Sequence, residues 1–252
     1  MSEAGRVLAL AGTELRLMLR NKTVAVSSVA LPLALGLFWA FSFSGAEEPG
    51  MAAMVIALQL SVVLAMGIYV TATQTVVARR HTRVLKRMRT SGISDAGLLV
   101  ATVAPAVVLG LGQLVVFGII NVATGTPLPA DPFPLLLALL GGLALVVTAA
   151  LATTVITPSP ERAQITTLPL TFVLLGATVL LTMAPDEGWW QAIVAVPGAA
   201  IGQLTQLAYR GGTWASGVAG LPALLPAVAA LLVWPALFGY LAARRFRWDP
   251  RR

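Results

Sequence analysis

Residues 51–77, MAAMVIALQLSVVLAMGIYVTATQTVV, and the segment RRHTRVLKRMR that follows at 79–89 decide the fold of this chain. The first stretch contains no Asp, Glu, Lys, Arg or His, whereas basic side chains dominate the second. An α-helix of about 20 apolar residues crosses the ~30 Å hydrocarbon core of a bilayer. A charge at the centre of such a helix would cost roughly 2.5–3.5 kcal/mol. The sequence therefore predicts a membrane-spanning helix that ends in a basic loop.

The same pattern recurs along the 252 residues of the chain. Hydrophobic residues make up 58% of the sequence and charged residues only 11%, unlike the balance of a soluble domain. Six stretches of at least 20 residues contain no charged residue and no histidine: 24–43, 51–77, 96–121, 133–156, 165–184 and 221–243. We therefore predict an all-α integral membrane protein, with a single domain over residues 1–252 and six transmembrane helices.

The placement of charge predicts the orientation in the membrane. Sixteen of the seventeen Lys and Arg residues lie before the first stretch, after the second, after the fourth and after the sixth. The alternate connections carry acids, at Glu47, Glu48, Asp131, Asp186 and Glu187. The positive-inside rule then puts both termini and the loops at 78–95 and 157–164 in the cytoplasm of a multi-pass plasma-membrane protein. The net charge of +7 fits anionic headgroups beside the spans better than nucleic acid.

The residues that catalysis and metal binding need are scarce in this chain. There is no cysteine, the one histidine is His81 in the basic loop, and no predicted span contains an aspartate. No Gly-x-x-x-x-Gly-Lys-Ser/Thr phosphate loop occurs. We therefore expect a protein that is not an enzyme and binds no cofactor. Ion-coupled carriers usually need ionisable groups inside their spans. An ion-coupled secondary transporter is thus disfavoured, although coupling through carbonyls and hydroxyls stays open, as does a non-transporting scaffold subunit.

Residues 5–20 have the spacing of an amphipathic helix before the first span. Leu8, Ala11, Leu15, Met18 and Leu19 recur on one side, while polar residues share the opposite face: Arg6, Thr13, Arg16 and Arg20. Such a helix can lie in the headgroup plane with its apolar side down. The sequence predicts an N-terminal interfacial helix, and a simple topogenic anchor is the alternative interpretation.

The loop after the second span, residues 78–94, also has amphipathic spacing. Four basic side chains fall near one helical face and the apolar side chains on the other: Arg79, Arg83, Lys86 and Arg87 against Val84, Leu85 and Met88, with Arg89 directly after them. Gly92 is a suitable helix stop, and Ser94 a suitable cap for the third span. The sequence predicts a short basic helix that can dock on a cytoplasmic partner. A solvated basic loop is the alternative interpretation.

The segment at about 185–220, between the last two spans, is too long and too apolar for a plain loop. It contains Trp189 and Trp190, and it is interrupted by Pro197-Gly198. A seventh crossing would put the basic C-terminal tail outside, against the charge rule. We therefore predict short re-entrant helices before the last span, with the two tryptophans at the interface.

The order of these parts, over nearly the whole chain, resembles the permease subunit of bacterial ABC-2 type transporters. The run ELRLMLRNKT at 14–23 is similar to the interfacial helix that leads into the family's first span. The Lys-Arg-apolar-Arg core at 86–89 is similar to the family's coupling helix. Arg80 stands where the family usually has an acid, and Ser91-Gly92 replaces a Thr-Pro turn.

This resemblance implies an exporter half that dimerises, as a homodimer or a heterodimer, and that is driven by two copies of a separate ATP-binding subunit. ATP and Mg would then bind to that partner and not to this chain. The resemblance assigns contact with the ATPase to the helix at 79–89. It also implies that the second and fifth spans border a path for a drug, a lipid-like molecule or a peptide. Those spans offer Gln59, Thr71, Gln74, Thr167 and Thr171, although polar groups in lipid more often join helices.

Overall fold

The computed structural model describes residues 2–20, 26–45, 48–88, 92–183, 188–215 and 220–248, which form helices and turns without a β-strand. Most elements are α-helices, whereas η1 and η2 are π-helical and η4 is a 3₁₀-helix. In chain order the elements are α1 (Glu3–Arg20), η1 (Val26–Ala30), α3 (Leu31–Ser42), α4 (Pro49–Val62), η2 (Val63–Val70), α5 (Thr71–His81), α6 (Val84–Met88), α7 (Asp95–Ala123), α8 (Pro132–Ile156), α9 (Pro160–Met183), η4 (Gly188–Ala195), α10 (Ala199–Arg210) and α11 (Leu224–Arg245). The predicted all-α class is confirmed.

Five helical segments are long and apolar enough to cross a membrane: Pro49–His81, Asp95–Ala123, Pro132–Ile156, Pro160–Met183 and Leu224–Arg245. They coincide with the second to sixth predicted stretches, apart from small differences at their ends. The first predicted stretch, 24–43, contains a shorter apolar helix, Ser28–Ser42. At 1.5 Å per residue that helix is about 23 Å long, less than the ~30 Å hydrocarbon core. Residues 24 and 25 lie outside the described residues, and the count of six spans stays a prediction.

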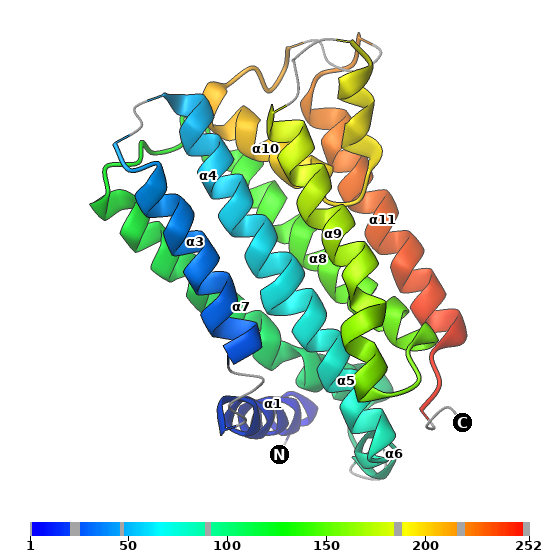
Figure 1. Ribbon diagram of the computed structural model, residues 1–252. Helices are drawn as coiled ribbons and strands as arrows, with labels where there is room; N and C mark the ends of the chain where they lie inside the picture. Colours follow the sequence, from blue (N-terminus) through cyan, green and yellow to red (C-terminus); the bar gives the residue numbers. More distant parts are fainter. Residues whose placement is uncertain are drawn as a thin grey trace.

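Successive long helices run along the bundle in alternating directions, from α3 through α4–α5, α7, α8 and α9 to α11 (Figure 1). As a result α1, α6 and the end of α11 lie at the same end of the bundle, which we call the inner end (Figure 1). The end of α3, the start of α4 and the loop before α8 lie at the opposite, outer end (Figure 1). The basic segments of the sequence that the structure describes thus gather at the inner end, apart from Arg210.

The segment formed by α4, η2 and α5 lies at the centre of the bundle. It contacts α3, α7, α8, α9 and α10. In its most apolar stretch 78% of the residues are buried, against 33% or less in the other four candidate spans. Small side chains such as Ala53, Ala57, Ala65 and Ala72 are at most 1% exposed. Small residues let neighbouring helices approach closely. This close approach allows several helices to pack around the α4–η2–α5 segment.

The helix α1 lies across the inner end of the bundle instead of along it (Figure 1). It contacts α7. Leu8 and Leu19, on its predicted apolar face, are 72% and 52% exposed, which leaves them available to headgroups. The Glu3 carboxylate accepts a hydrogen bond from the Ser94 N–H at 3.1 Å. The pKa of Glu3 is lowered mainly by a hydrogen bond with the Ser94 side chain, and further by the hydrogen bond with the Ser94 backbone. This contact fastens the start of α1 to the start of α7.

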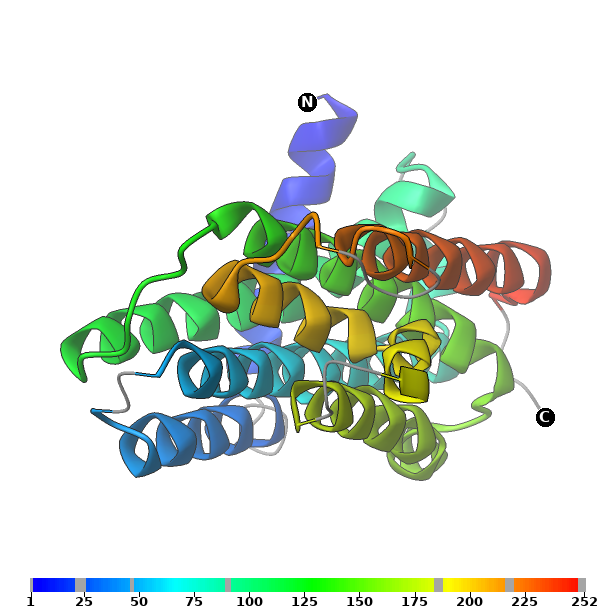
Figure 2. The same ribbon diagram turned by 90° about the horizontal axis from the view of Figure 1, so that it is seen from above.

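Two short helices, η4 and α10, lie at the outer end between α9 and α11 (Figures 1 and 2). Gly198 joins them with φ of 93°, and a Cβ there would come within 2.7 Å of the Leu174 carbonyl oxygen. Only glycine suits both that conformation and that close approach. Short helices before the last span were predicted, whereas their depth in a membrane stays a prediction. The expected interfacial positions of Trp189 and Trp190 fall on side chains outside the described part of the structure.

Candidate functional site

A cavity of about 760 Å³ lies in the inner half of the bundle, between α1, α3, η2, α5 and α9. We call it the inner cavity. Small-molecule sites typically measure about 300–1,000 Å³, so its volume suits such a ligand. Its wall combines apolar side chains with amides, hydroxyls and two charged groups: Leu17, Met18, Leu31, Met66, Val70 and Leu168, with Glu14, Gln74, Thr75, Arg79, Thr82, Gln164, Thr167 and Thr171. This lining is chemically amphipathic.

Three of the five residues predicted to border a path line the inner cavity. These are Gln74 on α5 with Thr167 and Thr171 on α9, so the second and fifth predicted spans do meet there. Thr71 is not part of the lining, and its hydroxyl donates a hydrogen bond to the Met66 carbonyl oxygen at 3.4 Å. Gln59 lies in the outer half and lines a different cavity.

The polar groups of the inner cavity differ in their hydrogen bonding. The Thr167 hydroxyl donates to the Ala163 carbonyl oxygen at 2.8 Å, and the Thr171 hydroxyl donates to the Thr167 carbonyl oxygen at 2.9 Å. These hydroxyl protons are therefore used within α9. The Gln74 amide makes no hydrogen bond with any residue that the structure describes. Gln74, like Gln164 in the same wall, thus has an amide with both donor and acceptor capacity available to a ligand.

An ion pair in the inner cavity was not predicted from the sequence. Nη2 and Nε of Arg79 lie 2.5 Å and 3.1 Å from Oε2 of Glu14. The Arg79 side chain is 26% exposed and the Glu14 side chain 7%. Glu14 follows Ala11 and precedes Met18 at helical spacing, so it occupies the apolar face of α1. An acidic residue on the apolar face of a helix indicates a basic partner inside the protein, so Glu14 is the sequence signal for this ion pair. The pair joins α1 to the inner end of α5.

The predicted coupling helix is divided in the structure. It is interrupted because Arg83 has φ of 59°, a left-handed conformation that an α-helix cannot contain. Arg79 therefore belongs to α5, while α6 holds only Val84–Met88. Leu85 is fully buried and anchors α6, whereas Arg83 and Arg87 are exposed. Val84 and Met88 are half-buried. Arg89 and the side chain of Lys86 lie outside the described part of the chain.

The start of α7 has the predicted signals. Gly92 has φ of 72°, the left-handed conformation that glycine adopts most readily after a helix. The Ser94 hydroxyl accepts a hydrogen bond from the Gly97 N–H at 3.1 Å and caps the helix. The cap at Ser94 is therefore confirmed.

Arg80 lies inside the protein and not on a surface for a partner. It is 1% exposed and is the largest fully buried side chain among the described residues. Its Nη1 donates to the Thr154 carbonyl oxygen at 2.9 Å, and its Nη2 donates to the Thr157 carbonyl oxygen. Both carbonyls belong to the C-terminal end of α8, where unpaired carbonyls and the negative end of the helix dipole stabilise a cation. Arg80 thus fastens α5 to α8.

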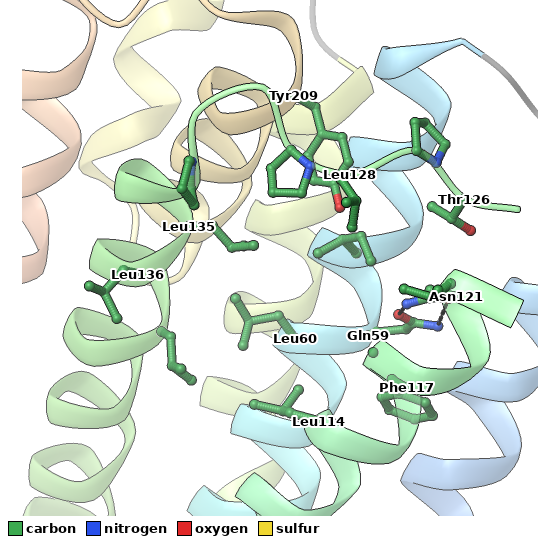
Figure 3. A pocket seen from close by; sticks show the side chains of 17 residues that line it. Gln59, Leu60, Leu114, Phe117, Asn121, Thr126, Leu128, Leu135, Leu136 and Tyr209 are labelled. Carbon is green, nitrogen blue, oxygen red and sulfur yellow. Dashed lines mark hydrogen bonds between the residues drawn. The ribbon is translucent and has the colours of Figure 1, made fainter.

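A second cavity, of about 430 Å³, lies in the outer half between α4, α7 and α8 (Figure 3). We call it the outer cavity. In its wall, Gln59 Nε2 donates to Asn121 Oδ1 at 3.2 Å, and Asn121 Nδ2 donates to Gln59 Oε1 at 2.7 Å (Figure 3). Gln59 Nε2 also donates to the Gly36 carbonyl oxygen at 3.0 Å. The predicted path residue Gln59 therefore joins α3, α4 and α7 by hydrogen bonds.

In the described part of the chain, the titratable side chains that line the two cavities are Glu14, Arg79 and Tyr209. Among the residues described, no three His, Asp or Glu side chains gather as possible metal ligands. His81 is exposed at the inner end and lines neither cavity. Shape, hydrogen bonding and the Glu14–Arg79 ion pair of the inner cavity are what these cavities offer a ligand.

Comparison with known proteins agrees with this architecture. A family model described as ABC-2 family transporter protein matches residues 18–244. The matched range runs from the end of α1 to the end of α11, so it contains α5, α6 and almost all of both cavities. No curated protein matches the chain. Since the family model covers far more than half of the residues, the chain belongs to the ABC-2 family of transporter proteins.

Proposed function

We propose that this chain is the membrane-spanning permease subunit of an ATP-driven ABC exporter. The protein is a multi-pass membrane protein of a transporter family, and ABC-2 permeases typically work with an ATP-binding subunit. In this proposal it lies in the plasma membrane with six spans and both termini in the cytoplasm. It pairs with a second permease copy, identical or different, and with two ATP-binding subunits that bind ATP and Mg.

The inner cavity is the observation that carries the proposal. It lies at the end of the bundle that carries the basic segments, next to α1 and the end of α5. Its amphipathic wall suits a molecule with an apolar body and a few hydrogen-bonding groups, such as a drug, a lipid-like molecule or a peptide. A substrate of this kind would enter from the cytoplasm or the inner leaflet and leave on the outer side.

Contacts around α5 supply a physical basis for coupling to ATP. The exposed side of α6 would meet the ATP-binding subunit, while the buried Leu85 ties α6 to the bundle. Arg80 would carry the displacement of α5 to α8, and Arg79 would carry it to α1. The inner cavity lies between these contacts, so a shift of α5 would change its access.

An ion-coupled secondary transporter and a non-transporting scaffold are the alternative functions. A secondary carrier would move substrate when given only an ion gradient. A scaffold would bind its partners without substrate-stimulated ATP hydrolysis. The proposed permease should co-purify with an ATP-binding protein from native membranes, and ATP hydrolysis by the complex in liposomes should rise when substrate is added. Co-purification without any response to candidate substrates would favour the scaffold.

Replacing Gln74 should weaken substrate binding more than replacing the cavity threonines. The Gln74→Leu variant removes an amide with free hydrogen-bonding capacity, which corresponds to about a fivefold rise in the substrate concentration for half-maximal transport. Thr167→Val and Thr171→Val remove hydroxyls already bonded within α9, so we expect changes below about twofold. Transport into inverted vesicles measures all three. A larger effect of the threonine variants would contradict this assignment of Gln74.

Reversing charge on α6 should uncouple ATP hydrolysis from transport. In the double variant Lys86→Glu/Arg87→Glu, repulsion of a partner that accepts basic residues should lower ATP-driven transport at least about tenfold. The helices should still insert, because these residues lie outside the apolar segments. Arg162→Glu, a reversal of another exposed inner-end arginine, is the matched control. If the double variant assembled and transported like the parent protein, α6 would not be the coupling element.

A further inference from the structure

We propose that the outer cavity binds one acyl chain of a membrane lipid, at a site separate from the inner cavity. The cavity lies in the outer half of the bundle, beside helices long and apolar enough to span a bilayer. This proposal depends on the membrane location of the chain and not on the proposed direction or substrate of transport.

The wall of the outer cavity has the chemistry that a hydrocarbon chain requires. Most of its surface is apolar: Leu60, Leu114 and Leu135 point into it (Figure 3), and Phe117, Leu136 and Leu139 also line it. The amides of Gln59 and Asn121 bond to each other. They therefore offer little to a polar ligand. The loop above the cavity contains Pro127 and Pro129, which have no backbone N–H to donate.

The mouth of the outer cavity is continuous with the surface that faces lipid. On α7, Val115 and Val122 are 62% and 63% exposed, and on α8, Leu136 and Leu140 are 51% and 55% exposed. Gly118, also on α7, is both exposed and part of the cavity lining. A Cβ built on Gly118 meets no atom within 4 Å. An acyl chain of the surrounding bilayer can therefore enter beside Gly118 without leaving an apolar medium.

Size and position separate this site from the inner cavity. A volume of about 430 Å³ falls within the usual range for small ligands, about 300–1,000 Å³. The two cavities share no lining residue. Burial of a flexible hydrocarbon chain against these leucines is favoured by dispersion contacts that an empty cavity would forgo. A bound chain would also support Phe117 and the Gln59–Asn121 pair, which connect α7 to the central segment.

Photo-crosslinking with lipid tests this site. The full chain is placed in phosphatidylethanolamine vesicles that contain a phospholipid with a photoactivatable diazirine in its acyl chain, with no substrate and no ATP-binding subunit. After irradiation, mass spectrometry locates the labelled peptides. We expect labelling concentrated on the cavity-lining segments of α7 and α8. In Gly118→Leu, whose side chain fills the mouth, that labelling should fall about tenfold.

Gly112→Leu is the matched control, because it adds the same side chain to the same helix. Gly112 is also exposed with no atom within 4 Å of a Cβ, but it does not line the outer cavity. It should keep the labelling of the parent protein, and both variants should keep its thermal unfolding midpoint. Equal labelling of Gly118→Leu and Gly112→Leu, or labelling spread evenly over all lipid-facing helices, would overturn the proposal. Neither result would bear on ATP-driven export.

Discussion

Arg79→Ala is expected to destabilise the protein by about 3 kcal/mol, the typical cost of leaving a buried charge without its partner. The remaining Glu14 carboxylate is only 7% exposed, so water cannot readily replace the guanidinium. Glu14→Ala should cost much less, about 1 kcal/mol, because Arg79 is 26% exposed and can turn toward solvent. This asymmetry distinguishes a buried pair from a surface ion pair, for which both substitutions would be small.

Unfolding by SDS in mixed micelles measures both changes, and a double-mutant cycle isolates the interaction between the two side chains. Arg16→Ala is the control, since Arg16 is an exposed arginine on α1. It should stay within about 0.5 kcal/mol of the parent protein. Because the pair joins α1 to α5 in the wall of the inner cavity, Arg79→Ala should also reduce ATP-driven transport. Additive effects of the two substitutions would show that the ion pair is not formed.

Arg80→Ala is expected to be at least as damaging, with a loss of about 3–5 kcal/mol in the free energy of unfolding. The substitution leaves a cavity where the largest fully buried side chain of the described residues lies. It also leaves the Thr154 and Thr157 carbonyls at the end of α8 without their donor. Arg80→Lys keeps the charge but supplies a single ammonium in place of two guanidinium nitrogens, so an intermediate loss is expected.

The readouts for Arg80 are the unfolding free energy and the number of substrate molecules moved for each ATP hydrolysed. If Arg80 carries motion from α5 to α8, Arg80→Lys should lower that ratio even at temperatures where the protein stays folded. Arg162→Ala removes an exposed arginine at the inner end and should change neither quantity. An Arg80→Ala protein as stable as the parent protein would contradict the buried contacts with α8.

The spans were predictable because they depend on local composition. A stretch of about 20 apolar residues without charge has few ways to satisfy its backbone except as a helix in lipid. In the segment at 24–43 the described helix, Ser28–Ser42, is shorter than a full crossing, so a span there stays a prediction. Composition shows how apolar a stretch is, but it does not determine where a helix in that stretch begins and ends. Here η1 packs against η2, and α3 packs against α4.

The candidate site was predictable only in part, because its contacts join residues that lie far apart in the sequence. The resemblance to the ABC-2 family singled out Gln74, Thr167 and Thr171, and these three residues do line one cavity. It could not reveal that Glu14 pairs with Arg79, or that Gln59 pairs with Asn121, over separations of 65 and 62 residues. Arg80 was noted only as a departure from a family pattern, and its role became visible once α8 was placed beside α5.

The left-handed conformation of Arg83 could likewise not be predicted from the spacing of basic and apolar residues. Spacing favoured one continuous basic helix, because a non-glycine residue at positive φ is uncommon and has no reliable sequence signal. The break changes the interpretation of the basic residues, since Arg79 and Arg80 contact the bundle while Arg83 and Arg87 are exposed. A single run of similar side chains thus divides into two anchors and an outward-facing surface.

The most direct test of the account is transport by the purified chain in sealed vesicles, with and without the ATP-binding protein that we expect to co-purify with it. We predict flux of an amphipathic substrate only when that partner and Mg-ATP are both present, and no flux when the chain alone is given a proton or sodium gradient. Substrate movement by the chain alone, driven by such a gradient, would contradict the account.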